Sequence, residues 1–314
     1  MTRDPFEDPK FKGQFSGHET FPLRHLWLRK AYDEVVRKGD KATRDIFNNP
    51  ESIITFGVGR NMVSSIRHWA ISCGIIEEVS AGYRPAQLGK YLFDEDTGRD
   101  PYLESPATAW LLHWIIASDP HRTTTWYYAF NRFNGQTFDR DTLAGLIKDL
   151  SDEKKWARVS AASVKRDVEC FVRSYVVRAD GKFVEDAMEP VLAELGLIHP
   201  MGPKSFKFRR GPKPSLPDGV FLYALDEYWR GRGKQAETLS VEELAFTPGS
   251  PGRVFKLDEV SLVERLAVIE DSSAGRFLWS DSAGIRSVVR RQPINDPFEL
   301  LDLAYETVGE RRVA

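Results

Sequence analysis

Apolar positions at helical spacing, beside two close glycines, predict a helix-turn-helix in residues 51–72. Residues 51–56 can form a short helix, and Gly57-Val58-Gly59 supplies a sharp turn because glycine tolerates positive φ. A second helix is expected over residues 60–72. Its apolar face consists of Met62, Val63, Ile66, Trp69 and Ala70. Because residues 75–85 then have the pattern of a β-hairpin, the whole unit is predicted to be a winged helix.

The other face of the second helix is polar. It is expected to carry Arg60, Asn61, Ser64, Ser65, Arg67 and His68. Arginine and asparagine can make bidentate contacts with base edges, while serine and arginine reach phosphates. This residue mix predicts a DNA-recognition helix. The alternative is a face that is merely solvated, as most charged helix faces are.

A second helix-turn-helix is predicted within residues 139–177. Residues 141–150 form one amphipathic helix, and residues 163–175 form another with Ser163 as its N-cap. Lys165 and Arg166 would then lie in the first turn, where recognition helices usually meet DNA. The acidic neighbours Asp167 and Glu169 leave solvent exposure or a protein contact as alternatives.

The C-terminal third has the order of a further winged-helix-like module. Helices are expected at 185–197, from 219 onward, at 239–244 with a Ser240-x-x-Glu243 capping box, and at 261–269, followed by a strand at 276–280. The fold is therefore predicted to be mainly α with small β-hairpins, multi-domain, and built from winged helix-turn-helix modules. The expected domains are an N-terminal winged-helix domain (1–98), a central helical domain (99–203), and a basic linker with a C-terminal winged-helix-like domain (204–314).

Several residues that could carry chemistry are better explained as core. Cys73 and Cys170 are far apart, without a Cys-x-x-Cys pair, so we expect reduced core cysteines and neither a zinc site nor a disulfide. His113 lies in the apolar segment 105–118 and is expected to be a core histidine. The aromatic run 125–130 is likewise expected to pack inside, with stacking on unpaired bases as the alternative.

Charge and composition limit the function classes. The chain has 314 residues and a formal net charge of −2, so DNA binding would depend on local basic patches. One such patch lies between residues 204 and 234. Its members are Lys204, Lys207, Arg209, Arg210, Lys213, Arg230, Arg232 and Lys234. No apolar run has the length of a membrane span and the N-terminus has no apolar signal core, so we expect a cytoplasmic protein without membrane contact.

Catalytic motifs are sparse. A phosphate-binding Gly-x-x-x-x-Gly-Lys-Ser/Thr loop is absent, so no nucleotide cofactor is expected, and the zinc-peptidase spacing His-Glu-x-x-His is not met. A metal-dependent nuclease would place a carboxylate before an acidic-x-Lys tripeptide, so that both acids hold an ion on the scissile phosphate. Asp139 and Glu153-Lys154-Lys155 fit that spacing only loosely.

His18 and Glu19 form the more interesting pair. They lie in a glycine-containing loop before a predicted helix in which Pro22 would occupy the first turn. A histidine could act as general base and a glutamate as metal ligand in phosphodiester cleavage, which makes both candidate catalytic residues. The favoured alternative is that their side chains cap that helix and hold the loop against Arg24 and Trp27.

Two segments together resemble a known family. They are Phe-Ser-Gly-His-Glu-Thr-Phe at 15–21 with Arg24 and Trp27, and Gly-Val-Gly-Arg-Asn-Met-Val at 57–63 with Ile66 and Trp69. These segments resemble the SspB family, the B component of the Ssp DNA phosphorothioation system, in which sulfur replaces a backbone oxygen of DNA in bacterial anti-phage defence. The resemblance extends through residues 101–104, 110–114, 166–168, 250–255 and 283–285.

The resemblance implies a DNA-binding protein that nicks one strand so that sulfur can be inserted. It implies three protein partners: a cysteine desulfurase, an ATP-pyrophosphatase and an ATPase. No family motif assigns a nucleophile or metal ligand to a numbered residue. If nicking needs a metal, Mg²⁺ is expected, with Mn²⁺ as an alternative, because hard cations suit phosphoryl transfer. A homodimer would suit a palindromic site, although nothing in the sequence demands one.

The leading hypothesis is therefore a sequence-directed nickase on double-stranded DNA. Its rival is a non-enzymatic DNA-binding adaptor or regulator that recruits the sulfur-transfer enzymes, and a third hypothesis is a pure protein-interaction scaffold. The candidate catalytic residues are His18 and Glu19. The candidate DNA-binding residues are Arg24, Arg60, Asn61, Ser64, Arg67, His68, Lys165 and Arg166.

Overall fold

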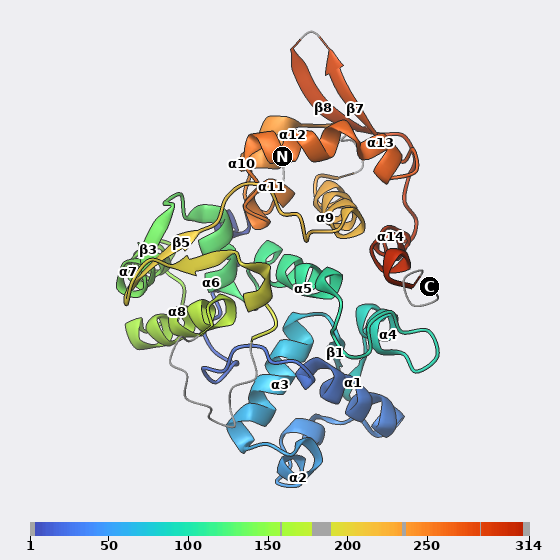
Figure 1. The fold of residues 1–314 in the computed structure, drawn as a ribbon. Coiled ribbons are helices and arrows are strands. Elements are labelled where there is room, and N and C mark those ends of the chain that lie inside the picture. The colour runs from blue at the N-terminus through green and yellow to red at the C-terminus, as the bar shows by residue number, and fades with distance from the viewer. Residues whose placement is uncertain (1–3, 158, 178–189, 234–236, 283, 310–314) are drawn as a thin grey trace.

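Helices dominate the computed structural model, which describes residues 4–157, 159–177, 190–233, 237–282 and 284–309 (Figure 1). The predicted mainly helical fold with small β-hairpins is confirmed. The α-helices are α1 (Trp27–Lys38), α2 (Ser52–Phe56), α3 (Arg60–Ser72), α4 (Gln87–Phe93), α5 (Pro106–Ser118), α6 (Thr124–Tyr127), α7 (Arg140–Glu153), α8 (Ala161–Tyr175), α9 (Asp218–Arg230), α10 (Val241–Phe246), α11 (Pro251–Val254), α12 (Glu259–Ala267), α13 (Ile269–Ser272) and α14 (Phe298–Gly309).

The described strands form small antiparallel sheets. They are β1 (Ile76–Val79), β2 (Gly82–Pro85), β3 (Thr137–Asp139), β4 (Ile198–Pro200), β5 (Ser205–Phe208), β6 (Thr238–Ser240), β7 (Phe277–Ser282) and β8 (Ile285–Arg290). Their orders are β1-β2, β3-β5-β4 and β6-β8-β7. In the last two sheets the strand that precedes a helical segment pairs with the second strand of the following hairpin, as in Phe138↔Phe206 and Leu239↔Val288.

The same topology occurs in the N-terminal segment in reduced form. There the isolated bridge Thr43↔Gly82 replaces the first strand, and α2, α3 and the β1-β2 hairpin follow. Gly82 is required at this contact because a Cβ there would lie 2.0 Å from the carbonyl oxygen of Ala42. Three segments of the chain therefore share the order extended strand or bridge, helices, hairpin, and they lie at the bottom, left and top of Figure 1.

The turn between α2 and α3 forms for the reason that the sequence predicted. Gly57 caps the C-terminus of α2 with φ 65°, a left-handed conformation that glycine adopts without steric cost. Gly59 differs, since its φ of −63° and ψ of 159° are open to any residue. Only the first glycine of the pair is thus needed for the turn itself.

Several predicted helix boundaries are wrong, including those of α7 (predicted 141–150) and α12 (predicted 261–269). Helix α8 begins at Ala161 with Ser160 as its N-cap, whose hydroxyl accepts from the amide of Ser163, because Ala161 and Ala162 are strong helix formers that extend the helix toward the N-terminus. Of the helix predicted over 185–197, residues 185–189 lie outside the described part. The remainder is a 3-10 turn, Ala193–Leu195, preceded by an antiparallel bridge between Pro190 and Arg24.

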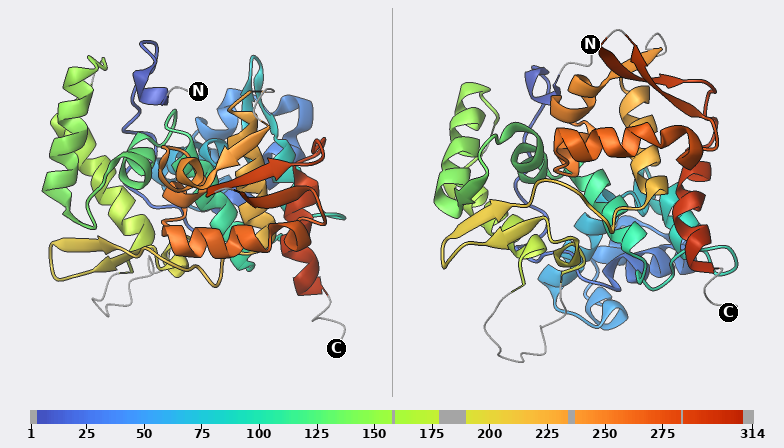
Figure 2. Two further views of the ribbon diagram at one scale, coloured as in Figure 1. Left: turned by 90° about the horizontal axis from the view of Figure 1, so that it is seen from above. Right: turned by 45° about the horizontal axis from the view of Figure 1, so that its top comes forward.

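The buried residues form one continuous hydrophobic cluster that draws on all three predicted domains. The Trp126 ring packs edge-to-face on Trp69 of α3 and on Phe171 of α8, with centroids 5.4 and 5.6 Å apart. Helix α5 runs through the middle of the molecule in each view (Figures 1 and 2) and is almost wholly buried. The domain boundaries stay a prediction. Among the described helices, none combines the length and apolar character that crossing a membrane requires.

The residues that the sequence assigned to the core are confirmed there. Cys73 and Cys170 are free and buried, and burial raises the pKa of both thiols. His113 is fully buried: Tyr175 Oη donates to its Nδ1 (2.8 Å), and its Nε2 donates to the carbonyl of Val254 (2.9 Å). In the aromatic run, Trp126, Tyr127 and Phe130 are buried.

Candidate nucleic-acid interface

The N-terminal half of α3 presents the polar groups that a recognition helix needs. Arg60 and Asn61 are exposed, Ser64 and Arg67 are half-buried, and Arg60, Asn61 and Arg67 have no hydrogen-bond or ion-pair partner among the described residues. No side chain caps the N-terminus of α3, so its first amides are open to an acceptor from outside. The exposed N-terminal end of α3 thus presents the Arg60 guanidinium, the Asn61 side-chain amide and uncapped backbone N–H groups.

Two residues expected on this polar face are buried instead. Ser65 donates through Oγ to the carbonyl of His18 (2.9 Å), and His68 is only 5% exposed. They lie one turn apart on α3, and the loop that contains Gly17 and His18 covers that side of the helix. A Cβ on Gly17 would lie 2.5 Å from His68 Nδ1. The pKa of His68 is lowered to about 3, first by burial and then by His18, so His68 is a neutral interior residue rather than an exposed DNA contact.

His18 links the N-terminal loop to α8. Its Nε2 lies 2.5 Å from Asp167 Oδ1, and its Nδ1 accepts from the backbone amide of Thr20 (3.0 Å). Since Nδ1 is an acceptor, Nε2 carries the hydrogen and donates to the carboxylate. His18 and Asp167 are 3% and 2% exposed. Both ring nitrogens are therefore engaged, and neither is available to take a proton from a ligand in this conformation.

Glu19 lies on the surface of the same loop. Glu19 and Thr20 have φ of 46° and 67°, a left-handed conformation that is uncommon for residues other than glycine, and Gly17 has φ 113°. The Glu19 side chain is exposed, while the neighbouring His18 points inward. The structure thus separates the two predicted catalytic side chains to opposite sides of the loop.

The favoured alternative for this pair is only partly right. Helix α1 begins at Trp27 with Leu26 at its N-cap and no side-chain cap, so Pro22 lies outside the helix and His18 does not cap it. The Arg24 guanidinium packs over the rings of Phe21 and Trp27, with 5.6 and 5.3 Å to their centroids. The loop therefore packs against Arg24 and Trp27 as expected, and it is also held by α8 and α3.

The second predicted recognition helix, α8, presents one free cation. Lys165 pairs with Asp141 of α7 (3.1 Å), whereas exposed Arg166 has no partner among the described residues. The acidic neighbours are both occupied, since Asp167 holds His18 and Glu169 pairs with Arg140 (2.7 Å).

The loosely spaced nuclease pair does not come together. Asp139 is the N-cap of α7, where its carboxylate accepts from the amide of Thr142 (2.8 Å), and Glu153 is the last residue of the same helix. A 14-residue helix rises about 20 Å at 1.5 Å per residue. The two carboxylates therefore cannot hold one ion.

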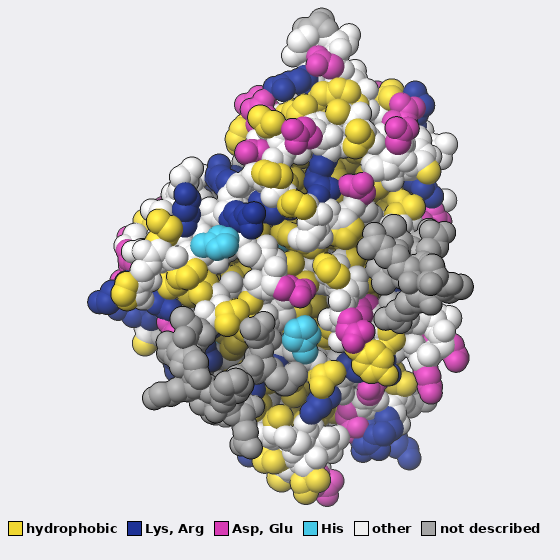
Figure 3. All heavy atoms as spheres, in the orientation of Figure 1, with side chains coloured by type: hydrophobic (Ala, Val, Ile, Leu, Met, Phe, Trp, Pro, Cys, Tyr) yellow, Lys and Arg dark blue, Asp and Glu magenta, His cyan; other side chains and the backbone are white. Residues whose placement is uncertain are grey.

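The basic segment 204–234 does not form a single surface patch. Lys204, Lys207, Arg209 and Arg210 are exposed and without partners among the described residues, and Lys234 lies outside those residues. Lys213 is buried and donates to backbone carbonyls, Arg230 pairs with Asp226, and Arg232 pairs with Glu243. Lysine and arginine side chains gather where β5 and the chain after it approach α11 (Figure 3).

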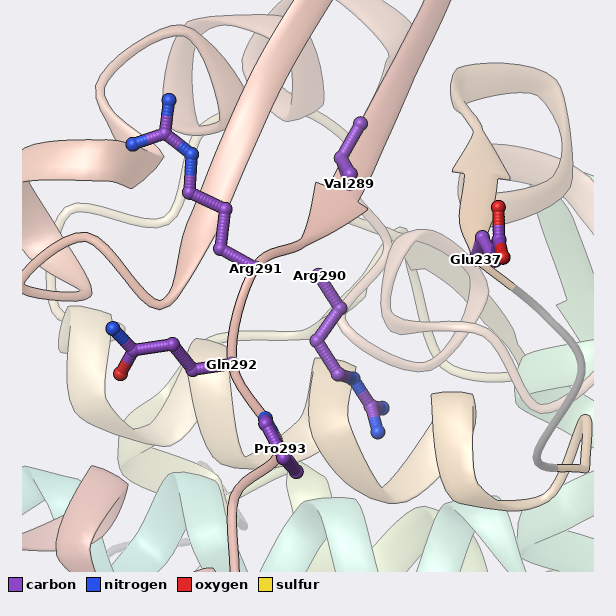
Figure 4. A pocket seen from close by; sticks show the side chains of 6 residues that line it. All are labelled: Glu237, Val289, Arg290, Arg291, Gln292 and Pro293. Carbon is purple, nitrogen blue, oxygen red and sulfur yellow. The ribbon is translucent and has the colours of Figure 1, made fainter.

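A cavity of about 350 Å³ lies at the end of β8 but offers no free chemistry (Figure 4). Arg290 and Arg291 line it and point in different directions. Arg290 stacks over Trp229 of α9 (4.7 Å) and pairs with buried Asp226 (3.2 Å), while Arg291 pairs with Glu270 (2.9 Å). Arg290 shares Asp226 with Arg230, and Arg291 is paired with Glu270, so we assign this cavity no function.

Comparisons with known proteins agree with the resemblance seen in the sequence. Two crystal structures of SspB match the fold, one of them with a bound magnesium ion. The magnesium-bound structure has a TM-score of 0.83 and the other 0.82; each is 29% identical to this chain, covering 94% of it and 88% of the SspB chain. SspB is a component of a DNA phosphorothioation system, and it is a structural homologue of this protein. A search of curated proteins found no match.

Because that homologue binds a magnesium ion, the side chains of this protein that could coordinate Mg²⁺ are of interest. Mg²⁺ takes oxygen ligands, usually one or two carboxylates with waters or phosphates. Among the described residues no group of three or more His, Cys, Asp or Glu side chains could hold a metal ion, and the buried carboxylate beside His18 is bound to that histidine. Among the described residues there is therefore no cage of three or more such protein ligands for Mg²⁺, and we derive no step through the ion.

The match to a family model extends over most of the chain. Residues 15–305 fit the model of a family described as a protein of unknown function, DUF4007. This range contains the loop with His18, all of α3 and the 250–255 segment. The chain therefore belongs to the DUF4007 family.

Proposed function

We propose that this protein is the DNA-binding component of a DNA phosphorothioation system and that it binds double-stranded DNA through α3. The observation that carries the proposal is that exposed Arg60 and Asn61 and half-buried Arg67, all on α3, have no partner among the described residues. If the protein were only a protein-interaction scaffold, these three side chains would have no evident function. The structural similarity to SspB supports the same role.

We further propose that the repeated strand-helix-helix-hairpin segments are winged helices. In the first segment α3 would enter the major groove and the β1-β2 hairpin would be the wing. Arg166 of α8 would contact DNA in the second segment, with Lys165 reaching phosphate only by leaving Asp141. The support is topological: two sheets have the same strand pairing, and the β1-β2 hairpin with the Thr43↔Gly82 bridge is a reduced form of it.

Two activities are compatible with this DNA role. The first is nicking of one strand so that sulfur can be inserted, which the similarity to SspB supports. The second is a non-catalytic adaptor that recruits the cysteine desulfurase, the ATP-pyrophosphatase and the ATPase. The adaptor is favoured by the commitment of both His18 nitrogens to contacts within the fold.

One experiment separates them. Supercoiled plasmid is incubated with the purified protein in Mg²⁺, in Mn²⁺ and in EDTA, and a gel-shift assay is run on the same DNA. Open circles that form with either metal and disappear in EDTA support the nickase. Binding without nicking contradicts a nickase that acts alone and leaves the adaptor, or a nickase that needs its partners. Absence of binding contradicts the proposal as a whole.

A further inference from the structure

A cavity distinct from α3 brings together three cations from distant parts of the chain. Its volume is about 170 Å³, and Arg210, Arg253 and Lys256 line it together with the start of α12. Arg210 follows β5, Arg253 is on α11, and Lys256 comes directly after α11. The volume is more than ten times the ~10–15 Å³ that one water molecule needs, so a small polyatomic anion fits.

Within the described part of the chain, none of the three basic side chains has a carboxylate partner. Arg210 has no partner among the described residues. Arg253 donates to neutral acceptors, the carbonyl of Phe246 (3.1 Å) and Asn134 Oδ1 (2.7 Å).

Lys256 is almost fully enclosed, at 2% exposure. Its Nζ donates to the carbonyls of Ala129 (3.3 Å) and Phe130 (2.7 Å) and lies 4.4 Å from the centroid of the Phe208 ring. These contacts are with neutral groups alone. The Lys256 Nζ is thus solvated by backbone carbonyls and an aromatic ring, with no charged group among these contacts.

Two carboxylates also line the cavity, and each has a partner other than the three basic residues. Asp258 caps α12 by accepting from the amide of Ser261 (2.8 Å), and Glu259 pairs with Arg286 of β8 at the surface. Burial and the charges of Arg210 and Arg253 lower the pKa of Lys256, and burial, Arg210 and Arg132 lower the pKa of Arg253. Gathering like charges in a partly enclosed site is unfavourable unless an anion joins them.

The backbone at this site is held in place. Lys256 has φ 52°, an uncommon left-handed conformation, and its carbonyl accepts from the amide of Gly211 (3.1 Å) and from Nζ of the buried Lys213 (3.2 Å). The segment that carries Arg210 is thereby tied to the segment that carries Lys256. The backbone positions of the cavity are therefore fixed by the fold.

We propose that this cavity binds a phosphate group, through Arg210 and Arg253, with Lys256 behind them. Arginine suits this role because its planar fork of N–H donors matches phosphate oxygens. The phosphate could belong to the DNA backbone or to a free phosphate compound. The DNA source rests on the proposed function, whereas phosphate binding itself does not.

Arg210→Ala is the best variant because Arg210 has no partner in the fold to lose, and Arg209→Ala is its matched control, an adjacent exposed arginine that does not line the cavity. The melting temperature is measured in rising inorganic phosphate at constant ionic strength. We expect saturable stabilisation of the wild type and of Arg209→Ala, and at least a tenfold weaker apparent phosphate affinity in Arg210→Ala. Without phosphate, Arg210→Ala should melt at or above the wild-type temperature, because a repelling charge is gone.

The same proteins are titrated with duplex DNA over a range of salt. Weaker binding and a salt slope smaller by about one in Arg210→Ala, but not in Arg209→Ala, identify the DNA backbone as the source. Loss of the phosphate effect with unchanged DNA binding identifies a free phosphate compound. If Arg210→Ala matches Arg209→Ala in both assays, the inference is wrong, even where α3 binds DNA. If the wild type binds no DNA, the proposed function fails and the phosphate titration alone decides the inference.

Discussion

Burial determines whether an individual histidine is available for chemistry or serves only to hold the structure together. His18 combines the residue type of a general base with the environment of a structural residue: it is 3% exposed and joins the N-terminal loop to α8. His121 and Asp119 form a pair with the same 2.5 Å separation but with side chains 68% and 65% exposed. The chemistry of the two pairs is alike, and only the surroundings differ.

This contrast predicts a difference in stability. His18→Ala or Asp167→Ala should lower the free energy of unfolding by about 2–4 kcal/mol, since each leaves a buried polar partner unsatisfied. Asp167→Asn should lose less, because its amide oxygen still accepts from Nε2. His121→Ala should change stability by no more than about 1 kcal/mol. Urea unfolding measures all four, and a His18→Ala protein of wild-type stability that fails to nick would instead mark a catalytic histidine.

A second prediction at the residue scale concerns DNA binding by the arginines of α3. Arg60→Ala and Arg67→Ala should each weaken duplex binding by about 1–3 kcal/mol if they contact bases, measured by fluorescence anisotropy. Arg291→Ala is the control, because Arg291 is paired with Glu270. Unchanged affinity in both α3 variants would support the scaffold hypothesis and contradict binding through α3.

At the scale of elements, the two glycines between α2 and α3 have different roles: Gly57 is needed for the turn, whereas Gly59 is not. Gly57 needs its positive φ, but Gly59 does not, and a Cβ at Gly59 would meet no atom within 4 Å. An unconstrained glycine directly before the free N-terminus of α3 leaves room for another molecule to approach the backbone.

Alanine at the two glycines should therefore act in opposite ways. Gly57→Ala should destabilise the protein by about 1 kcal/mol, because it forces alanine into a left-handed conformation. Gly59→Ala should be neutral or stabilising by up to about 1 kcal/mol and yet weaken DNA binding. Gly145→Ala within α7, also in open space, is a control that should affect stability alone. Thermal melts and DNA titrations test this, and undiminished DNA affinity in Gly59→Ala would argue against close approach there.

At the scale of the whole molecule, buried histidines make stability depend on pH. Burial lowers the pKa of His68 and of His113 to about 3 in the folded protein, whereas histidine in the unfolded chain titrates near 6.5. The unfolded state therefore binds more protons between these values. Stability is full above pH 6.5 and falls as the pH drops toward 3.

The slope approaches about 1.4 kcal/mol per pH unit for each histidine well below pH 6.5. Glu227 acts in the opposite sense, since burial raises its pKa and ionising it in the folded state is unfavourable. Urea unfolding at intervals from pH 7 to pH 4.5 should show the free energy of unfolding falling with pH. In His68→Gln the slope should be smaller by the contribution of one proton, about 1.4 kcal/mol per pH unit. A slope unchanged by that substitution would contradict a neutral, buried His68.

The local pattern of the sequence determined many structural features of this protein. The mainly helical fold follows from apolar spacing, the turn at Gly57 from glycine's freedom at positive φ, and the cap of α10 from Ser240, whose hydroxyl accepts from the Glu243 amide as its capping box predicts. The core places of His113 and the cysteines follow from apolar neighbours in sequence. These features depend on interactions within a few residues, which a sequence displays directly.

Tertiary structure alone decided which polar residues are available for function. His68 has the spacing of an exposed residue on α3, but a loop some fifty residues earlier in the chain covers it. His18 has the residue type of a catalytic base, but Asp167 from α8 binds it. The cations at the proposed phosphate cavity come from separate segments, so no local pattern joins them. Burial and charge compensation depend on contacts between distant segments, and only the folded chain brings those segments together.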